Sequence, residues 1–292
     1  MNKETLQEYL ESLHTSGSAK SYLYSIIKFI ETNPDCEKYG YQDIVDYMFE
    51  LSKRDLKGTY KSKVLASIKK YYDYLMHIGV RDNHPCRRLS IKDNRRKGMN
   101  YEDLFTSDEL ELLLNREERY RYLGHRNKLI ISMLIYQGLS SFEIERMNIQ
   151  DIDVEAATIR IKASRKLNGR TLSMHPRQVT MALRYLGDSR PFLLRKELPT
   201  NRLIITKLGK SETVDGIHAM IEPLKVMFPE KKLHPKSIRA SVISNWLNDR
   251  NIDLEDVQLM AGHKWPSSTE RYRRADMDQQ RRLINEFHPL ND

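Results

Sequence analysis

Residues 261–274 read AGHKWPSSTERYRR, and upstream of them residues 233–241 read LHPKSIRAS. Tyr272 follows His263 by nine residues and has an arginine on either side. An attack by a phenol on a phosphodiester requires a nucleophile on a movable helix, together with cationic donors for the charge on the non-bridging oxygens. A tyrosine in a basic helix is also typical of an amphipathic surface. The presence of His263 and Arg239 in the neighbouring motifs favours, over a plain surface helix, a site in which an exposed tyrosine is surrounded by cations.

The sequence between these motifs, residues 237–264, has the pattern of two helices joined by a tight turn. Apolar side chains recur one helical turn apart in both segments. They are Ile238, Val242, Trp246 and Leu247 in the first segment and Leu254, Val257 and Ala261 in the second. Arg239 opens the first helix and His263 follows the end of the second. We therefore expect compact packing to bring these two side chains into one pocket.

The region from about residue 105 to the C-terminus resembles the catalytic domain of the tyrosine recombinase (phage integrase) family. The C-terminal signature of that family is His-x-x-Arg, then Leu-Gly-His, then a nucleophilic tyrosine. This chain has Arg239 in KSIR, His263 in LMAGH and Tyr272 in STERY. Residues 105–114, FTSDELELLL, are similar to the entry helix of the domain.

Residues 136–153, YQGLSSFEIERMNIQDID, resemble the family block Thr-Gly-Leu-Arg-x-x-Glu and the Asp-hydrophobic-Asp that follows it. Glu143 is in register, but Ser140 stands where the family has its first arginine. A serine hydroxyl brings no charge, whereas a guanidinium binds phosphate through two parallel hydrogen bonds. Loss of such a donor costs roughly 3–4 kcal/mol in comparable sites. We expect that another cation, such as Arg146 or Lys162, replaces it, or that the enzyme is slow or inactive.

The histidine of the His-x-x-Arg motif is replaced as well. Lys236 stands at its position, and His234 lies two residues earlier. A lysine there keeps a donor and a positive charge but loses an easy proton shuttle at neutral pH.

Residues 158–174 predict a β-hairpin. Ile159 and Ile161 alternate with polar residues, and LNG supplies a turn before RTLSM. Lys166 is expected at the tip, where the family carries a lysine that protonates the leaving 5′ oxygen, with Arg165 as the alternative.

The charge of the chain is unevenly distributed. The net charge is +9, but residues 1–50 carry 4 Lys/Arg against 9 Asp/Glu, whereas residues 51–97 carry 14 against 4. A basic run this dense, interleaved with Tyr60, Tyr71, Tyr72 and Tyr74, indicates contacts to a nucleic-acid backbone, although a solvated helix face has the same composition. The candidate DNA-binding cations are Lys57, Lys61, Lys63, Lys69, Lys70, Arg95, Arg96 and Lys97.

The expected fold is mainly α with a small antiparallel β-sheet or hairpin, in two domains that close around duplex DNA as a clamp. Helical periodicity predicts helices near residues 4–14, 17–31, 42–53 and 57–78. We expect a helical unit at residues 1–90, a polar linker at 91–104, and a catalytic domain at 105–292. The resemblance makes the first unit a SAM-like core-binding domain. It also makes the C-terminal segment, with an apolar face at Met277, Leu283, Ile284 and Phe287, a tail exchanged with a neighbouring subunit.

Several other classes of protein are disfavoured. Cys36 and Cys86 lack metal-site spacing and are expected to be reduced thiols. The N-terminus has no apolar signal region, and the apolar run at residues 129–136, LIISMLIY, is too short to cross a bilayer and is expected to be a core helix. No nucleotide-binding fingerprint is present, and the histidines form no convincing metal site. We expect no cofactor, no metal and a cytoplasmic protein associated with the bacterial or archaeal nucleoid.

These observations predict a site-specific DNA recombinase or integrase that cuts and rejoins strands through a 3′-phosphotyrosyl intermediate. The covalent intermediate conserves the phosphodiester energy, so neither ATP nor metal is required. The resemblance implies a homo-tetramer on two double-stranded DNA sites, with a monomer as the alternative state free in solution. The chain has the size of a mobile-element integrase or of a chromosome-dimer resolvase, and Ser140 favours the mobile element. Two alternatives remain open: a catalytically inactive DNA-binding protein of the same fold, and a nicking-closing enzyme similar to topoisomerase IB.

Overall fold

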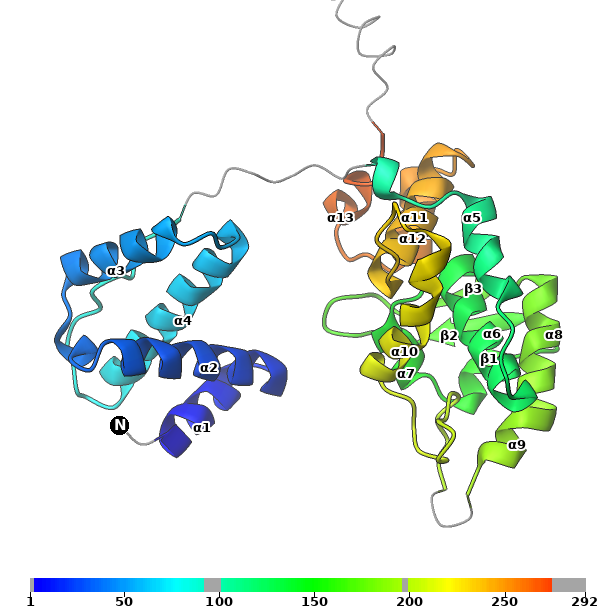
Figure 1. Cartoon of the computed structure of the whole chain (residues 1–292), viewed down its shortest axis with the longest axis horizontal. Coiled ribbons are helices and arrows are strands. Elements are labelled where there is room, and N and C mark those ends of the chain that lie inside the picture. The colour runs from blue at the N-terminus through cyan, green and yellow to red at the C-terminus, as the bar shows by residue number, and fades with distance from the viewer. Residues whose placement is uncertain (1–2, 92–100, 196–198, 275–292) are drawn as a thin grey trace, which may run out of the picture. The chain divides into compact units, whose positions relative to one another are not determined.

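The computed structural model describes residues 3–91, 101–195 and 199–274. The chain divides into two compact units, residues 1–96 and 97–292 (Figure 1). Throughout the described ranges the fold is mainly helical with one small antiparallel sheet, which confirms the predicted fold class. The predicted exchange tail and most of the predicted linker lie outside the described residues.

The described part of the N-terminal unit is built from helices that begin and end within one residue of their predicted bounds. They are α1 (Lys3–Leu13), α2 (Ser16–Thr32), α3 (Tyr41–Lys53) and α4 (Gly58–His77), with a 3-10 turn at Cys36–Lys38. Their apolar faces meet in a core in which Leu6, Leu10, Ile26, Phe29 and Ile68 are fully buried. Burial of each such side chain stabilises the fold by roughly 1.5–3 kcal/mol. Because this burial requires apolar residues on one helix face, the periodicity of the sequence predicted these helices well.

The tyrosines of α4 belong to this core, so the prediction that they line a nucleic-acid surface is wrong for three of them. Tyr71 and Tyr72 are fully buried and Tyr74 is 3% exposed. The Tyr72 hydroxyl donates to the Cys36 carbonyl oxygen at 2.7 Å, and burial raises the pKa of Tyr71 and Tyr72 far above the ordinary value. Helix α4 buries a wide face that includes Tyr71, Tyr72 and Tyr74. Tyr60, in the first turn of the helix, is only partly buried against the core.

The C-terminal unit packs helices around a second core. They are α5 (Ser107–Leu112), α6 (Arg121–Tyr136), α7 (Ser141–Arg146), α8 (Pro176–Arg184), α9 (Arg190–Leu193), α10 (Val214–Ile221), α11 (Pro235–Asn248), α12 (Leu254–Ala261) and α13 (Pro266–Glu270). A π-helical turn at Tyr185–Ser189 joins α8 to α9, and 3-10 turns lie at Tyr101–Asp103, Leu113–Asn115, Ile149–Asp151 and Glu222–Met227. The apolar run at residues 129–136 forms the buried half of α6, as predicted.

The sheet has the order β1-β2-β3 and is antiparallel. Its strands are β1 (Ile152–Asp153), β2 (Thr158–Ile161) and β3 (Arg170–Ser173). The predicted hairpin is therefore present. In its register Ile159 pairs with Leu172, and Ile161 pairs with Arg170.

Helices α11 and α12 form the predicted helix, turn, helix. Gly262 ends α12 in the left-handed conformation, with φ +70°. Tyr101, near the end of the predicted linker, packs on the C-terminal unit. The Tyr101 hydroxyl donates to the Arg273 carbonyl oxygen at 2.6 Å, and the Arg274 guanidinium lies 5.6 Å from the Tyr101 ring.

Within the described residues, no helix combines the length and the apolar character needed to cross a membrane.

Candidate active site

Ser140 is the N-cap of α7 and is fully engaged with Glu143. Its hydroxyl donates to Glu143 Oε2 at 2.8 Å and accepts from the Glu143 backbone N–H at 3.3 Å. Its own backbone N–H donates to the same carboxylate at 2.9 Å. This reciprocal arrangement is a capping box, which satisfies backbone donors that a helix start leaves unpaired. At the position of the family's first arginine, the serine therefore serves the helix.

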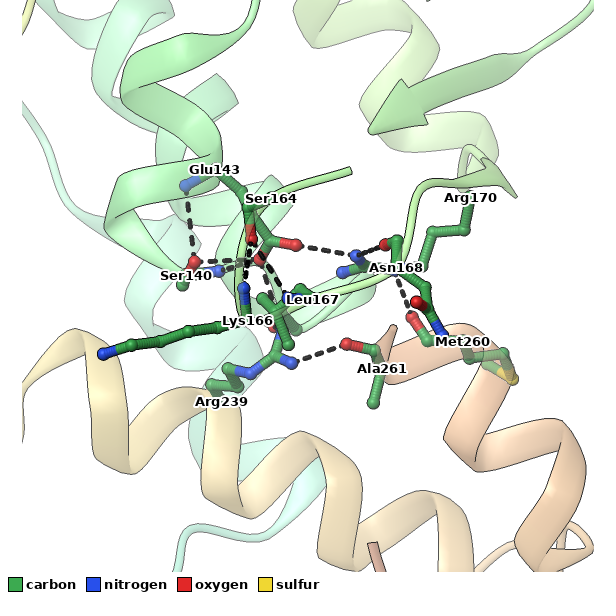
Figure 2. A network of polar contacts seen from close by, with 11 residues as sticks. Ser140, Glu143, Ser164, Lys166, Leu167, Asn168, Arg170, Arg239, Met260 and Ala261 are labelled. Atoms are coloured by element: carbon green, nitrogen blue, oxygen red, sulfur yellow. Dashed lines mark hydrogen bonds and ion pairs between the residues drawn. The ribbon is translucent and has the colours of Figure 1, made fainter. Parts of the chain in front are cut away.

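Glu143 lies between two arginines (Figure 2). Its Oε1 is 2.6 Å from Arg170 Nη1, and its Oε2 is 3.4 Å from Arg239 Nη1. Burial alone would raise the pKa of Glu143, but Arg170 and then Arg239 outweigh burial, so the pKa lies below its ordinary value. The carboxylate is ionised at neutral pH, and it holds two guanidinium groups that come from distant parts of the chain.

Arg239 is held by backbone carbonyls as well as by Glu143. From the start of α11, it donates through Nη1 to the Gly138 carbonyl oxygen and through Nη2 to the Ala261 carbonyl oxygen, both at 2.6 Å. Its side chain is 12% exposed. Such contacts preorganise the guanidinium, because its planar fork loses little freedom on binding.

His263 and Tyr272 lie together beside the ion pair of Arg239 and Glu143. Their rings are stacked, with centroids 6.1 Å apart and planes 14° apart. His263 Nδ1 is 2.9 Å from Thr269 Oγ1. Burial, followed by the charges of Arg239 and Arg170, lowers the pKa of His263 to about 4, so its ring is neutral at pH 7.

Tyr272 is fixed through its backbone. Its carbonyl oxygen accepts from Asn248 Nδ2 at 2.8 Å, and its N–H donates to the Thr269 carbonyl oxygen at 2.9 Å. The Arg271 guanidinium lies 5.7 Å from the centroid of its ring. The structure thus gathers Arg239, His263 and Tyr272 at one place.

The loop between β2 and β3 is docked against the end of α12. Asn168 N–H donates to the Gly262 carbonyl oxygen at 2.8 Å, and Leu167 forms an isolated β-bridge with His263. Arg165 and Lys166 lie at the tip and are exposed. Figure 2 shows the Lys166 side chain extending away from Glu143.

The predicted residues at the start of α11 have different surroundings. His234 is the N-cap, and its Nδ1 accepts from the Ser237 backbone N–H at 2.8 Å. Lys236 lies in the first helical turn and is exposed. His234 thus caps the helix, whereas the side chain of Lys236 is open to solvent.

The two cations expected to replace the first arginine have other partners. The Arg146 guanidinium lies 5.2 Å from the Phe142 ring, and Lys162 Nζ is 3.3 Å from Asp151 Oδ2. Neither is ion-paired with Glu143 in the part of the chain that the structure describes. Besides Arg239, the cation that pairs with Glu143 is Arg170, which was not among the predicted site residues. The register of the hairpin could have identified Arg170, because the residue that pairs with buried Ile161 lies on the same inward face of the sheet.

Few of the predicted DNA-binding cations of the N-terminal unit are unconstrained. Lys61 and Lys69 donate to the carbonyl oxygens of Ser52 and Arg87, both at 2.9 Å, and Lys70 pairs with Asp73 at 3.3 Å. Lys57 and Lys63 are exposed. Arg95, Arg96 and Lys97 lie outside the described residues.

A helical catalytic unit with a small sheet, in which an arginine, a histidine and a tyrosine converge, has the form of a tyrosine recombinase domain. Residues 103–279 match the model of the phage integrase family. That match covers more than half of the chain, and the chain belongs to this family. It is a tyrosine-type site-specific recombinase.

Similar proteins match over almost the whole chain. Tyrosine recombinase XerC of Lacticaseibacillus casei (strain BL23) is 25% identical over 98% of this chain and 98% of its own length. Tyrosine recombinase XerD of Listeria innocua serovar 6a is 22% identical over 99% of this chain and 94% of its own.

Solved structures share the fold. XerH site-specific recombinase bound to its difH substrate before cleavage has a TM-score of 0.74 and 15% identity, over 97% of this chain and 84% of that one. The Tn1549 transposon integrase in complex with circular intermediate DNA has a TM-score of 0.69 and 14% identity, over 96% and 98%.

Proposed function

We propose that Tyr272 is the nucleophile that cuts DNA in this recombinase. Its phenolic oxygen attacks the scissile phosphorus, the bond from phosphorus to the 5′ oxygen breaks, and the phenolic proton passes to solvent. The products are a 3′-phosphotyrosyl linkage and a free 5′-hydroxyl, and reversal by another 5′-hydroxyl rejoins the strand. The observation that carries the proposal is the stacking of Tyr272 on His263, beside a preorganised Arg239.

Arg239 and His263 bind the phosphate in this proposal. Arg239 supplies charge, and neutral His263 supplies a hydrogen bond from Nε2 when Nδ1 accepts from the Thr269 hydroxyl. Donors fixed before the reaction stabilise developing charge without reorganisation. Exposed Lys236 adds a positive charge at the rim.

Lys166 is the proposed general acid, and it gives its proton to the leaving 5′ oxygen. The loop that carries it is tied to Gly262 and His263, so its tip stays beside the site while the side chain remains free to turn toward bound DNA. Arg165, at the same tip, is the alternative donor of charge.

Double-stranded DNA is the proposed substrate and partner. Similar solved proteins are described as bound to a difH substrate or to circular intermediate DNA, and this chain has a net charge of +9. The N-terminal unit is the proposed core-binding domain, with Lys57 and Lys63 as exposed phosphate contacts. We further propose that the protein acts as a homo-tetramer on two DNA sites. We also propose that it recombines the DNA of a mobile element, since Ser140 departs from the usual family pattern.

A nicked suicide duplex tests the nucleophile, because loss of the short cleaved fragment traps the covalent adduct. A wild-type protein that binds the duplex but forms no adduct is an inactive DNA-binding protein. An adduct without strand exchange between two labelled duplexes indicates a nicking-closing enzyme similar to topoisomerase IB.

A further inference from the structure

The pocket around Glu143 contains a second guanidinium in addition to that of Arg239. Arg170 opens β3, and its side chain is 7% exposed. Nη1 is 2.6 Å from Glu143 Oε1, and Nε donates to the Met260 carbonyl oxygen, also at 2.6 Å. These contacts fix the Arg170 guanidinium at Oε1 of Glu143, whereas Arg239 pairs with Oε2 of the same carboxylate (Figure 2).

The remaining nitrogen of Arg170 has no partner. Nη2 is buried and makes no hydrogen bond within the described part of the chain. A buried donor without an acceptor is unfavourable, and each such group in a native structure requires an explanation. A ligand that supplies an acceptor is such an explanation.

The charges of the pocket are also unbalanced. Arg170 and Arg239 are two buried cations, whereas Glu143 is one carboxylate and His263 is neutral. The two arginines disfavour each other, since Arg170 lowers the pKa of Arg239 after burial has lowered it. One surplus positive charge is left beside Tyr272, and a phosphodiester carries one negative charge.

The backbone is shaped to admit Arg170. A Cβ on Gly262 would lie 2.5 Å from Arg170 Nη1 and 3.0 Å from the Asn168 carbonyl oxygen. The glycine at the end of α12 therefore leaves the space that the guanidinium occupies.

We propose that Arg170 replaces the missing first arginine and binds a non-bridging oxygen of the scissile phosphate through Nη2. The charge that the family places on α7 comes here from β3, while Ser140 keeps the cap of α7. Nη2 is buried in this structure, so the groups that cover it move aside when the phosphate enters. This inference rests on the proposed cleavage chemistry and adds a phosphate-binding residue to it.

The test compares the full-length wild type with Arg170→Gln, Arg170→Lys and the surface control Arg177→Gln. Single-turnover cleavage of the nicked duplex, duplex binding and thermal unfolding are measured for each. We expect Arg170→Gln to lower the cleavage rate by at least ~100-fold, as removal of one preorganised donor does, with binding changed only a few fold. Arg170→Lys keeps the charge without the fork and is expected to be intermediate.

Two further measurements distinguish an Arg170 that binds the scissile phosphate from an Arg170 that only stabilises the fold. A methylphosphonate at the scissile position removes the negative charge, so the deficit of the Arg170 variants relative to wild type shrinks. In the Arg170→Gln background, Ser140→Arg restores the missing charge and recovers at least ~10-fold of the rate, within the range that one charge-assisted donor provides.

An equal deficit on both substrates, together with no rescue, overturns the inference. If Arg170→Gln does not fold, the comparison of Arg170→Lys on the two substrates decides in the same way. Absence of any adduct from the wild type refutes the proposed function instead, which keeps the two failures apart.

Discussion

The Tyr272 ring stacks on the ring of His263, with the centroids 6.1 Å apart. The contact joins the segment after α13 to the end of α12, and it places a phenol beside the buried cations of the pocket. The Tyr272 backbone is tied to Thr269 and Asn248, whereas its side chain is only partly buried. A nucleophile needs this combination of fixed position and access.

Tyr272→Phe is expected to abolish the covalent adduct on the nicked duplex while leaving DNA binding within a few fold, because the change removes a hydroxyl and no charge. Denaturing gel electrophoresis and mobility shift measure the two quantities on the same preparation. An adduct that persists in Tyr272→Phe shows that another residue is the nucleophile.

Ser140→Arg in the otherwise wild-type chain is not expected to speed cleavage. A third guanidinium would meet like charge from Arg170 and Arg239, and loss of the serine cap costs about 1 kcal/mol of stability. Single-turnover cleavage and urea unfolding check both effects. A large rise in rate with unchanged stability would show that the pocket lacks a cation.

The stability of the C-terminal unit is expected to fall as the pH drops from about 6.5 toward 4. The pKa of His263 is about 4 in the folded protein and lies below its unfolded value, so the unfolded state binds more protons in this window. The loss attributable to His263 is at most about 3 kcal/mol. Urea unfolding at several pH values measures it. His263→Asn should unfold with a flatter pH dependence, and an unchanged slope would exclude His263 as the cause.

Gly262→Ala is expected to destabilise the protein by more than about 1 kcal/mol, because a Cβ is strained at positive φ. It would also meet Arg170 Nη1, so cleavage should fall more than DNA binding. Gly17→Ala is the matched control, since Gly17 lies in α2 with no neighbour within 4 Å of the added Cβ. Equal melting temperatures for the two variants would contradict the close approach.

Lys57→Gln combined with Lys63→Gln is expected to weaken DNA binding, because each change removes one contact between a lysine and a backbone phosphate. The slope of log K against log salt should fall by about 1 for each lost contact. Lys53→Gln, which alters a lysine already paired with Glu50, serves as the control. An identical slope in both proteins would remove the two lysines from the DNA interface.

Local pattern predicted most of the elements. The helices of the N-terminal unit, the buried half of α6, the hairpin and the α11–α12 pair follow from periodicity, because each buries one regularly spaced face. Tyr71 and Tyr72 were misassigned since periodicity alone does not tell a wide buried face of α4 from a basic surface with interleaved aromatics.

The helical class and the family motif residues Arg239, His263 and Tyr272 could be predicted without a structure, because they depend on spacing along the chain. The second cation that pairs with Glu143, the partner of Ser140, could be identified only from the folded chain. Arg146 and Lys162 are nearer to it in sequence, but the register of β2 and β3 turns Arg170 inward against Glu143. Contacts between distant segments depend on register and on the space left by Gly262, and neither is encoded in the spacing of any one motif.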